Sequence, residues 1–332
     1  MRVFIAGFGT VGQGVAEVIA SREEFFLKRY CKKIQIVGVM DSITYVTDSE
    51  GLDPLGLVSV KKETGKVGKE TYTDALKVLD SVEYDTLIEV SPTDYDTGGQ
   101  GLKNIVHALE CKKDVVTTNK GPLAIKFGEL ISLAKKNKCK LKFEGTVAGA
   151  MPIINLCHDN LIGENIHSIR GILNGTCNYI LSKMDSGQPF DQALKEAQQL
   201  GYAETDPSGD VEGYDSACKV VILANSLFDR NVTLSDVSIT GITGITEEAI
   251  SLAKSRDMVI RLIGEVGEDV LEVAPRLVPK GHPLSVSGTL NAAQIQSDLA
   301  GPIAISGRGA GKTETASAVL SDLISVMDDR KE

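Results

Sequence analysis

The chain opens with short apolar runs that alternate with longer stretches of helical periodicity. The apolar runs predict buried strands at residues 3–7, 34–40, 85–91, 114–119 and 140–145. Helical periodicity separates them at residues 11–30, 101–112 and 121–138. Because strands alternate with helices, this half is predicted to form a doubly wound parallel sheet, and the polar, turn-rich residues 41–73 read as an insertion.

The pattern changes after about residue 149. A strand is expected at 166–173, helices at 176–184, 190–200 and 211–228, and antiparallel strands at 258–267 and 270–279. These elements predict an α+β domain whose sheet has one face covered by helices. Residues 307–329 read as a glycine loop followed by a helix that returns to the first domain. The predicted divisions are therefore 1–149, 150–306 and 307–332.

The composition is that of an ordinary globular protein, long enough for two domains. Of the 332 residues, 45 are acidic and 35 basic, and the net charge of -10 argues against nucleic acid or an anionic membrane as partner. The six cysteines and four histidines show no C-x-x-C pair and no zinc-ligand spacing, which predicts reduced thiols without a Cys/His metal site. No stretch has the character of a membrane span or signal peptide, so we expect a cytoplasmic protein.

The stretch GFGTVG places Gly7, Gly9 and Gly12 between the first predicted strand and the first predicted helix. This spacing suits a tight turn, the close approach of a pyrophosphate and close packing, with the helix N-terminus facing the phosphates. It predicts a Rossmann-type dinucleotide site, and a tight packing turn is the alternative.

Two further features bear on the nucleotide. Asp41 ends the second strand and suits the ribose hydroxyls of NAD, although it lies further from Gly12 than the usual ~20 residues. Lys61 and Lys62 in the insertion suit a 2′-phosphate, so NADP stays open.

The loop GRGAGKT is not a P-loop, because Ser306 stands where the first glycine is required. A backbone approach to a ligand and a plain turn are both open for this loop.

Two lysines are candidates for chemistry. Lys219 lies four residues after Asp215 on a predicted helix, which allows either a surface ion pair of ~0.3–0.5 kcal/mol or a functional pair. Apolar residues flank Lys219, so burial would require a partner for its charge. Lys120 follows the carboxyl end of a predicted parallel strand, where ligands bind, but a lysine in a loop can also be merely solvated.

A predicted anion site completes the candidate chemistry. In GILNGTCNY a strand ends at Asn174 and Gly175, and a helix begins at Thr176, so free N–H groups and a hydroxyl face one point. With the carboxylates between residues 204 and 215 and the two lysines, this set would suit a small zwitterionic substrate.

Taken together, these stretches resemble the homoserine dehydrogenase family nearly end to end. The resemblance rests on GFGTVG at 7–12, TTNKGPLA at 117–124, EGTVAGAMPI at 144–153, GILNGTCNYI at 171–180, LGYAETDPSGDVEGYDSACK at 200–219 and GAGKTETA at 309–316. It implies reversible NAD(P)-dependent interconversion of L-aspartate 4-semialdehyde and L-homoserine, on the route to threonine and methionine. It also implies that residues 150–306 form a catalytic and dimerisation domain.

The resemblance further implies roles for single residues. Lys219 would be the general acid, and Lys120 would assist near the nicotinamide. The implied substrate-binding residues are Asp215, Glu204, Asp210, Gly175, Thr176 and Tyr202. The implied cofactor-binding residues are Gly7, Phe8, Gly9, Thr10, Val11, Gly12, Asp41, Ser91, Thr93, Lys120, Gly201 and Gly311.

A monovalent cation site is implied as well. Glu144 and the carbonyls of Val147, Gly149 and Met151 would hold Na⁺ or K⁺, and a plain turn is the alternative.

Assembly and regulation follow from the resemblance too. The family implies a homodimer joined through the sheet of the second domain. We expect no threonine feedback through a C-terminal regulatory domain. The rivals are another nicotinamide-dependent reductase and a non-enzymatic redox sensor that only binds NAD(P), and neither needs both Lys120 and Lys219.

Overall fold

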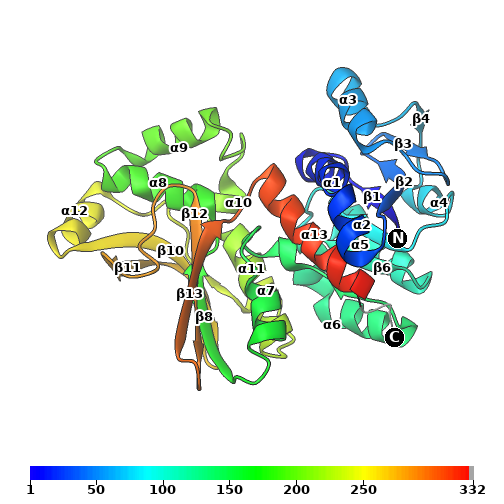
Figure 1. The fold of residues 1–332 in the computed structure, drawn as a ribbon. Coiled ribbons are helices and arrows are strands. Elements are labelled where there is room, and N and C mark those ends of the chain that lie inside the picture. The colour runs from blue at the N-terminus through cyan, green and yellow to red at the C-terminus, as the bar shows by residue number, and fades with distance from the viewer. Residues whose placement is uncertain (329–332) are drawn as a thin grey trace. The chain divides into compact units, whose positions relative to one another are not determined.

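The computed structural model describes residues 1–328 and contains one sheet in each of two units (Figure 1). The first unit comprises Met1–Thr146 and the described residues from Gly311 onward, and the second comprises Val147–Ala310. Residues 329–332 of the predicted C-terminal segment lie outside the described part of the chain. Within residues 1–328, no helix is both long enough and apolar enough to cross a membrane.

The first sheet has the strand order β4-β3-β2-β1-β5-β6-β7. Its parallel strands are β1 (Arg2–Ala6), β2 (Gln35–Met40), β5 (Thr86–Glu89), β6 (Asp114–Thr117) and β7 (Leu141–Lys142). Every residue of β5 and β6 is buried, as expected for strands covered on both faces. The predicted doubly wound parallel sheet is confirmed.

Helices connect these strands. They are α1 (Thr10–Ser21), α2 (Glu23–Tyr30), α4 (Ala75–Leu79), α5 (Gly99–Glu110), α6 (Lys120–Asn137) and the short 3₁₀ turn η1 (Glu144–Thr146). The prediction of one helix over residues 11–30 is wrong, because Arg22 leaves helical geometry with φ −109° and ψ 7°. The break starts a separate short helix in which only Phe26 is buried in the core.

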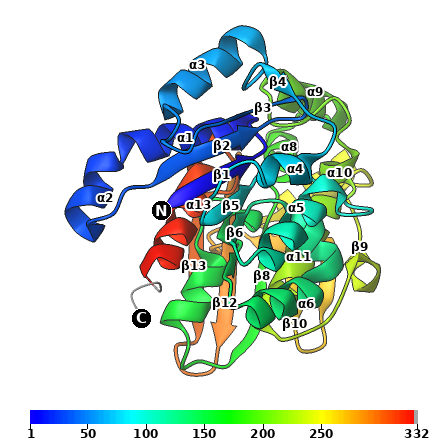
Figure 2. The same ribbon diagram turned by 90° about the vertical axis from the view of Figure 1, so that its right-hand side faces the viewer.

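Residues 41–73 are more than an insertion. They form β3 (Thr44–Thr47), α3 (Pro54–Thr64) and β4 (Glu70–Thr71), and β3 pairs antiparallel with β2 (Figure 2). Asp53 caps α3 by accepting hydrogen bonds from the N–H groups of Leu55 and Gly56, both at 3.1 Å. The segment therefore extends the sheet beyond β2, which ends directly before Asp41.

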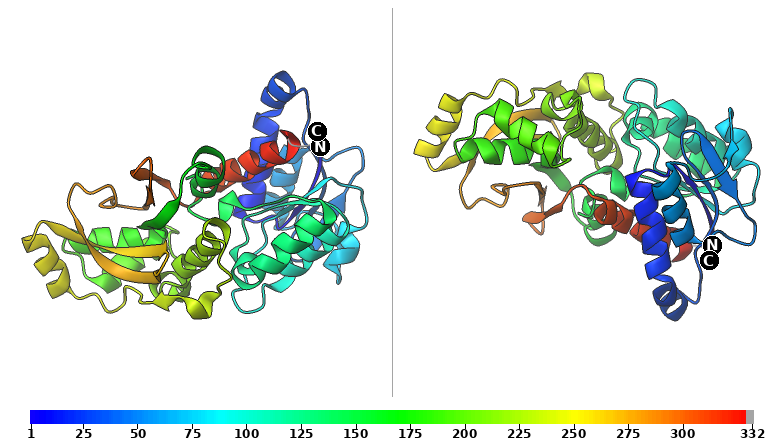
Figure 3. Two further views of the ribbon diagram at one scale, coloured as in Figure 1. Left: turned by 90° about the horizontal axis from the view of Figure 1, so that it is seen from below. Right: turned by 90° about the horizontal axis from the view of Figure 1, so that it is seen from above.

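The last described helix, α13 (Lys312–Asp328), packs beside α1 in the first unit, as both views of Figure 3 show. A Cβ on Gly14 would lie 2.6 Å from the carbonyl oxygen of Lys312, so the two helices approach closely at that glycine. Lys312 Nζ also donates to Glu17 Oε1 at 2.6 Å. The predicted return of the C-terminal helix to the nucleotide-binding fold is confirmed.

The second sheet has the order β13-β12-β8-β10-β11-β9. Its strands are β8 (Ile166–Ile172), β9 (Ser238–Ile239), β10 (Met258–Gly267), β11 (Leu271–Pro279), β12 (Leu290–Ser297) and β13 (Pro302–Arg308). Neighbouring strands are antiparallel, except that β9 runs parallel to β11. Strands β12 and β13 are not predicted by the sequence pattern, and β13 includes Gly307 and Arg308 of the predicted glycine loop.

Helices α8, α11 and α12 pack against β10 of this sheet. The helical segments of the unit are α7 (Ile153–Asn155), η2 (Leu156–Asn160), α8 (Gly175–Asp185), α9 (Phe190–Gln199), α10 (Ser208–Val211), α11 (Tyr214–Leu227), η3 (Leu234–Asp236) and α12 (Glu247–Ser255). The single helix predicted for residues 211–228 is wrong at its start, because Gly213 has φ +92° and separates α10 from α11. The α+β character of this unit is confirmed.

Candidate active site

The glycine turn joins β1 to α1 in the predicted place. Gly7 has φ +98°, and a Cβ there would lie 2.6 Å from the backbone nitrogen of Ser91. A Cβ on Gly12 would lie 2.2 Å from the carbonyl oxygen of Gly7, whereas one on Gly9 would meet no atom within 4 Å. The turn is therefore tight at its ends and open at Gly9, directly before the N-terminus of α1, which suits a pyrophosphate.

The other predicted residues of this turn differ in exposure. Thr10 is exposed and Val11 is half-buried against the core. Phe8 is 1% exposed and belongs to the hydrophobic core of the unit. A cofactor on this turn would therefore contact the backbone of Phe8 and not its ring.

Asp41 lies at the end of β2 and is surrounded by donors. Its carboxylate accepts hydrogen bonds from Lys61 Nζ at 2.7 Å, from the N–H groups of Ile43 and Thr44 at 2.8 and 2.7 Å, and from Val67 N–H at 2.9 Å. Burial raises the pKa of Asp41, but the hydrogen bonds from Lys61 and these N–H groups outweigh it and hold the pKa at about 2. The group is therefore a carboxylate at any physiological pH.

The carboxyl ends of β5 and β6 are tied together by side chains. Asn119, which caps α6 directly before Lys120, donates to Ser91 Oγ and to Pro92 O, both at 3.3 Å. Ser91 N–H in turn donates to Glu89 Oε1 at 2.9 Å. Lys120 is half-buried as the first residue of α6, and Thr93 is half-buried in the loop that follows Ser91. Ser91 and Lys120 thus lie at the same edge of the first sheet, where ligands of such sheets bind.

Lys219 is buried in the second unit, with only 8% of its surface exposed. Its Nζ donates to Asp215 Oδ2 at 2.6 Å and to the carbonyl oxygen of Leu173 at 2.6 Å. Because an ammonium group has three N–H donors, one donor is left for a ligand. The alternative of an exposed surface ion pair is thereby overturned.

Asn174 belongs to this network and is not among the substrate-binding residues predicted from the sequence. Its Nδ2 donates to Asp215 Oδ2 at 2.8 Å and to Asp210 Oδ1 at 2.6 Å, while its Oδ1 caps α8 by accepting from Cys177 N–H at 2.8 Å. The sequence does carry a signal for the role of Asn174, because an asparagine just before a predicted helix start is a typical N-cap. Asn174 holds the two aspartates beside Lys219.

The remaining predicted substrate residues lie around the start of α8. Thr176 Oγ1 donates to the carbonyl oxygen of Tyr202 at 2.7 Å, and Gly175 is the first residue of the helix. Tyr202 is exposed and its ring packs edge-on against Tyr179, with centroids 5.0 Å apart. Glu204 is exposed, and its carboxylate makes no hydrogen bond within the described chain. Gly201, a predicted cofactor residue, is exposed with φ +74°.

The residues predicted to hold a cation divide between the units. Glu144 is 2% exposed and belongs to the first unit, where its N–H donates to Asp322 Oδ2 at 2.9 Å. Val147, Gly149 and Met151 belong to the second unit, in a turn where Gly149 has φ +57°.

Gly311, a predicted cofactor residue, belongs to the first unit with φ +140°, and a Cβ there would lie 2.2 Å from Glu314 Oε2.

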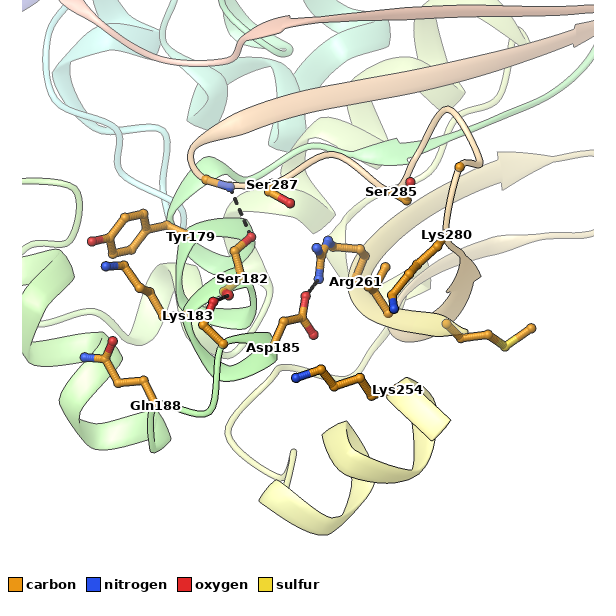
Figure 4. A pocket seen from close by; sticks show the side chains of 15 residues that line it. Tyr179, Ser182, Lys183, Asp185, Gln188, Lys254, Arg261, Lys280, Ser285 and Ser287 are labelled. Atoms are coloured by element: carbon orange, nitrogen blue, oxygen red, sulfur yellow. Dashed lines mark hydrogen bonds and ion pairs between the residues drawn. The ribbon is translucent and has the colours of Figure 1, made fainter. Parts of the chain in front are cut away.

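A pocket of about 740 Å³ in the second unit is lined by residues of α8, α12 and β10 and by the loop after β11 (Figure 4). In it, the buried Arg261 donates from Nη1 to Asp185 Oδ2 at 2.7 Å and links β10 to α8. None of the residues predicted to bind substrate lines this pocket. The cluster around Lys219 is therefore a separate feature of the unit.

Two family models match most of the chain. Residues 7–144 match the family model described as the NAD-binding domain of homoserine dehydrogenase, and residues 152–324 match the model of homoserine dehydrogenase. Homoserine dehydrogenase of Methanocaldococcus jannaschii is 46% identical over 100% of both chains. The NAD(+)-dependent homoserine dehydrogenase of Pseudomonas canavaninivorans is 38% identical over 98% of this chain and 96% of its own.

Solved structures extend the likeness. A crystal structure from Archaeoglobus fulgidus that bears the same family name has a TM-score of 0.92 at 45% identity, over 98% of this chain and 99% of that one. A hyperthermophilic archaeal homoserine dehydrogenase in complex with NADPH has a TM-score of 0.86 at 31% identity, over 99% of this chain and 98% of that one. The chain therefore belongs to the homoserine dehydrogenase family of NAD(P)-dependent oxidoreductases.

Proposed function

We propose that Lys219 is the proton donor when this chain reduces L-aspartate 4-semialdehyde to L-homoserine. The observation that carries the proposal is the geometry of Nζ, which has two acceptors at 2.6 Å and one further N–H donor. When bound, a nicotinamide cofactor would supply the hydride that the aldehyde carbon takes up. Lys219 gives a proton to the aldehyde oxygen as that oxygen becomes an alkoxide, and in the reverse direction the neutral amine takes the hydroxyl proton back.

Asp215 and Leu173 orient Lys219 for this step. The Asp215 carboxylate and the Leu173 carbonyl hold two of the three ammonium hydrogens, so the remaining one has a defined direction. In a buried site, such a fixed charge stabilises a developing alkoxide more than it would in water.

The two ends of the substrate need opposite charges. We assign its ammonium group to Asp215, Asp210 and Glu204. We assign its carboxylate to the N-terminus of α8 at Gly175 and Thr176, with Tyr202 beside them, because free N–H groups at a helix start favour anions. The Asn174 network supports this, because it holds two of the three carboxylates at the start of the same helix.

For the cofactor, we propose the residues of the glycine turn with Ser91, Thr93, Gly201, Gly311 and Lys120, which would assist near the reacting oxygen. We favour NAD over NADP, because the ionised Asp41 would repel a 2′-phosphate at the end of β2. Both candidate phosphate ligands already have carboxylate partners: Lys61 with Asp41 at 2.7 Å and Lys62 with Glu17 at 3.6 Å. The name of the Pseudomonas relative supports NAD, whereas the archaeal structure was solved with NADPH.

We also propose that Glu144 and the carbonyls of Val147, Gly149 and Met151 bind Na⁺ or K⁺. The oxygen donors support this, since a carboxylate and three backbone carbonyls are the hard ligands that such cations prefer. Replacing Na⁺ by choline should lower the melting temperature of the wild type but not of Glu144→Gln, and an equal shift in both would reject the site.

The assembly is a further proposal. We propose a cytoplasmic homodimer joined through the second sheet, acting in threonine and methionine biosynthesis. Each chain would have a nucleotide domain at 1–149, a catalytic and dimerisation domain at 150–306 and a returning segment at 307–332. The exposed apolar side chains of Leu277 and Leu290 on β11 and β12 support the interface. Light scattering after gel filtration should give twice the chain mass, and a monomer would refute the dimer.

The proposed function is tested by absorbance at the nicotinamide band with L-homoserine and either NAD or NADP. Lys219→Ala should slow turnover by at least about 100-fold, while the matched control Lys254→Ala, an exposed lysine of the same unit, should stay close to wild type. If the wild type binds both cofactors and reduces neither, the alternative of a non-enzymatic redox sensor replaces the enzyme.

A further inference from the structure

Three potential metal ligands meet at the amino edge of the first sheet, the edge opposite the one that carries Ser91 and Lys120. Asp80 lies between α4 and β5, and Cys111 lies between α5 and β6, so both precede the strands. His107 Nε2 lies 2.8 Å from Asp80 Oδ1 and 3.8 Å from Cys111 Sγ. All three ligand atoms lie within 4.8 Å of one another.

These separations are close to those of a tetrahedral zinc site. Zinc bonds of about 2.3 Å to sulfur and about 2.05 Å to nitrogen or oxygen give edges of about 3.6 Å for N···S and about 3.3 Å for N···O. The distances of 3.8 and 2.8 Å from His107 Nε2 differ from these edges by a few tenths of an ångström. The third edge, between the Asp80 oxygen and Cys111 Sγ, is at most 4.8 Å against about 3.6 Å for O···S in such a site, so zinc binding would draw these two side chains together.

Two helix ends fix the positions of the ligands. His107 lies in the last turn of α5, and Cys111 directly follows the helix. That helix end is closed by hydrogen bonds from Cys111 N–H to the His107 carbonyl at 2.9 Å and from Lys113 N–H to the Ala108 carbonyl at 2.8 Å. Asp80 caps the end of α4, where its N–H donates to the carbonyl of Leu76 at 3.0 Å. Since α4 packs against α5, the three groups are brought together before any metal binds.

A surface ion pair of His107 with Asp80 involves two of the three groups, and the third, the Cys111 thiol, lies 3.8 Å from the same imidazole nitrogen. Burial and the nearby charge of Asp80 raise the pKa of Cys111, so this cysteine is not an activated nucleophile. One thiol, one imidazole and one carboxylate form a donor set that suits Zn²⁺, whereas Mg²⁺ and Ca²⁺ prefer oxygen ligands alone.

We propose that Asp80, His107 and Cys111 bind a zinc ion whose fourth position is open to water. The side chain of Asp80 is 60% exposed, so solvent reaches the cluster. On binding, the Sγ–H bond of Cys111 is replaced by a Zn–S bond, and the proton leaves to solvent. The sequence showed no zinc spacing because Asp80 comes from a different helix.

The test uses untagged, metal-free, full-length protein titrated with Co²⁺ and then with Zn²⁺. Cobalt bound by a thiolate has a charge-transfer band in the near ultraviolet, and zinc should displace it at one ion per chain. The variants are Cys111→Ser and His107→Gln, and the matched control is Cys31→Ser, because Cys31 is also exposed. Circular dichroism checks that each variant is folded.

We expect the band in the wild type and in Cys31→Ser and its loss in Cys111→Ser. Zinc affinity should fall at least about tenfold in Cys111→Ser and His107→Gln, because loss of an outer-shell partner alone typically costs 10–100-fold. The proposal is overturned if the wild type shows no one-to-one zinc binding, or if Cys31→Ser loses as much affinity as Cys111→Ser. Neither outcome depends on enzyme activity or on the proposed role of Lys219.

Discussion

At the scale of single residues, Asn174 controls how the two aspartates lie beside Lys219. Asn174→Asp keeps an oxygen to cap α8 but replaces the donors to Asp210 and Asp215 with a third carboxylate. Because the buried Asp215 and the half-buried Asp210 each lose one donor and meet a like charge, kcat/KM should fall by about 30–100-fold, equivalent to about 2–3 kcal/mol. Steady-state kinetics with L-homoserine measure this. The control is Asn231→Asp, at an exposed position, and a wild-type kcat/KM in Asn174→Asp would contradict the proposed site.

Asp41 should set the cofactor preference. Asp41→Asn removes the carboxylate that repels a 2′-phosphate and takes from Lys61 its anionic partner, so the ratio of kcat/KM with NADP to that with NAD should rise at least about tenfold. Asp48→Asn, at an exposed carboxylate just after β3, serves as the control. An unchanged ratio would show that the nucleotide ribose does not reach Asp41.

The same carboxylate predicts a pH dependence of stability. Its pKa is about 2 in the folded protein against an ordinary value of 3.8, so folding favours the charged form by about 2 kcal/mol. Because the folded-state pKa is the lower one, this contribution is complete above about pH 4 and is lost as the pH falls towards 2. Urea unfolding of wild type and Asp41→Asn should show the full difference at pH 6 and a smaller one at pH 3. A constant difference would mean that Asp41 is not the titrating group.

At the scale of elements, two glycines of one turn should behave differently. A Cβ on Gly12 would lie 2.2 Å from the Gly7 carbonyl, so Gly12→Ala should destabilise the protein by about 1–3 kcal/mol through overpacking. A Cβ on Gly9 meets nothing within 4 Å, so Gly9→Ala should melt like wild type yet bind NADH at least about tenfold more weakly. Thermal melts and NADH fluorescence separate the effects, and full NADH affinity in Gly9→Ala would place the pyrophosphate elsewhere.

At the scale of the whole molecule, the first unit is completed by the end of the chain. Leu323 on α13 is 0% exposed and shares a core with Val3, Ile5 and Val15 of β1 and α1. Leu323→Ala should therefore cost about 2–5 kcal/mol, and hydrogen exchange should accelerate in β1, α1 and α13. Leu252→Ala, at a residue 56% exposed on α12, is the control. Acceleration confined to α13 would show that this helix is not part of the cooperative core.

The elements that the sequence pattern did not predict correctly share one property, which is a weak local signal. Strand β3 has only four residues and no apolar alternation, so its pairing with β2 decides that it is a strand. The break at Arg22 lies inside a continuous helical pattern, so periodicity does not mark it. The start of α11 depends on a positive φ at Gly213, which sequence periodicity does not report. The N-cap signals at Asp53 and Asn174, in contrast, were readable in the sequence.

The sequence by itself determined the parallel sheet, the glycine turn, the returning helix and the family, because these depend on periodicity, on residue type at short spacing and on motifs. It also brought Asp215 and Lys219 together, since residues four apart share one helix face. Only the tertiary structure decided that Lys219 is buried against Leu173, that Asn174 bridges two aspartates, and that Asp80 meets His107 and Cys111. Those contacts join residues from separate elements, and their distances are set by packing, which no local pattern encodes.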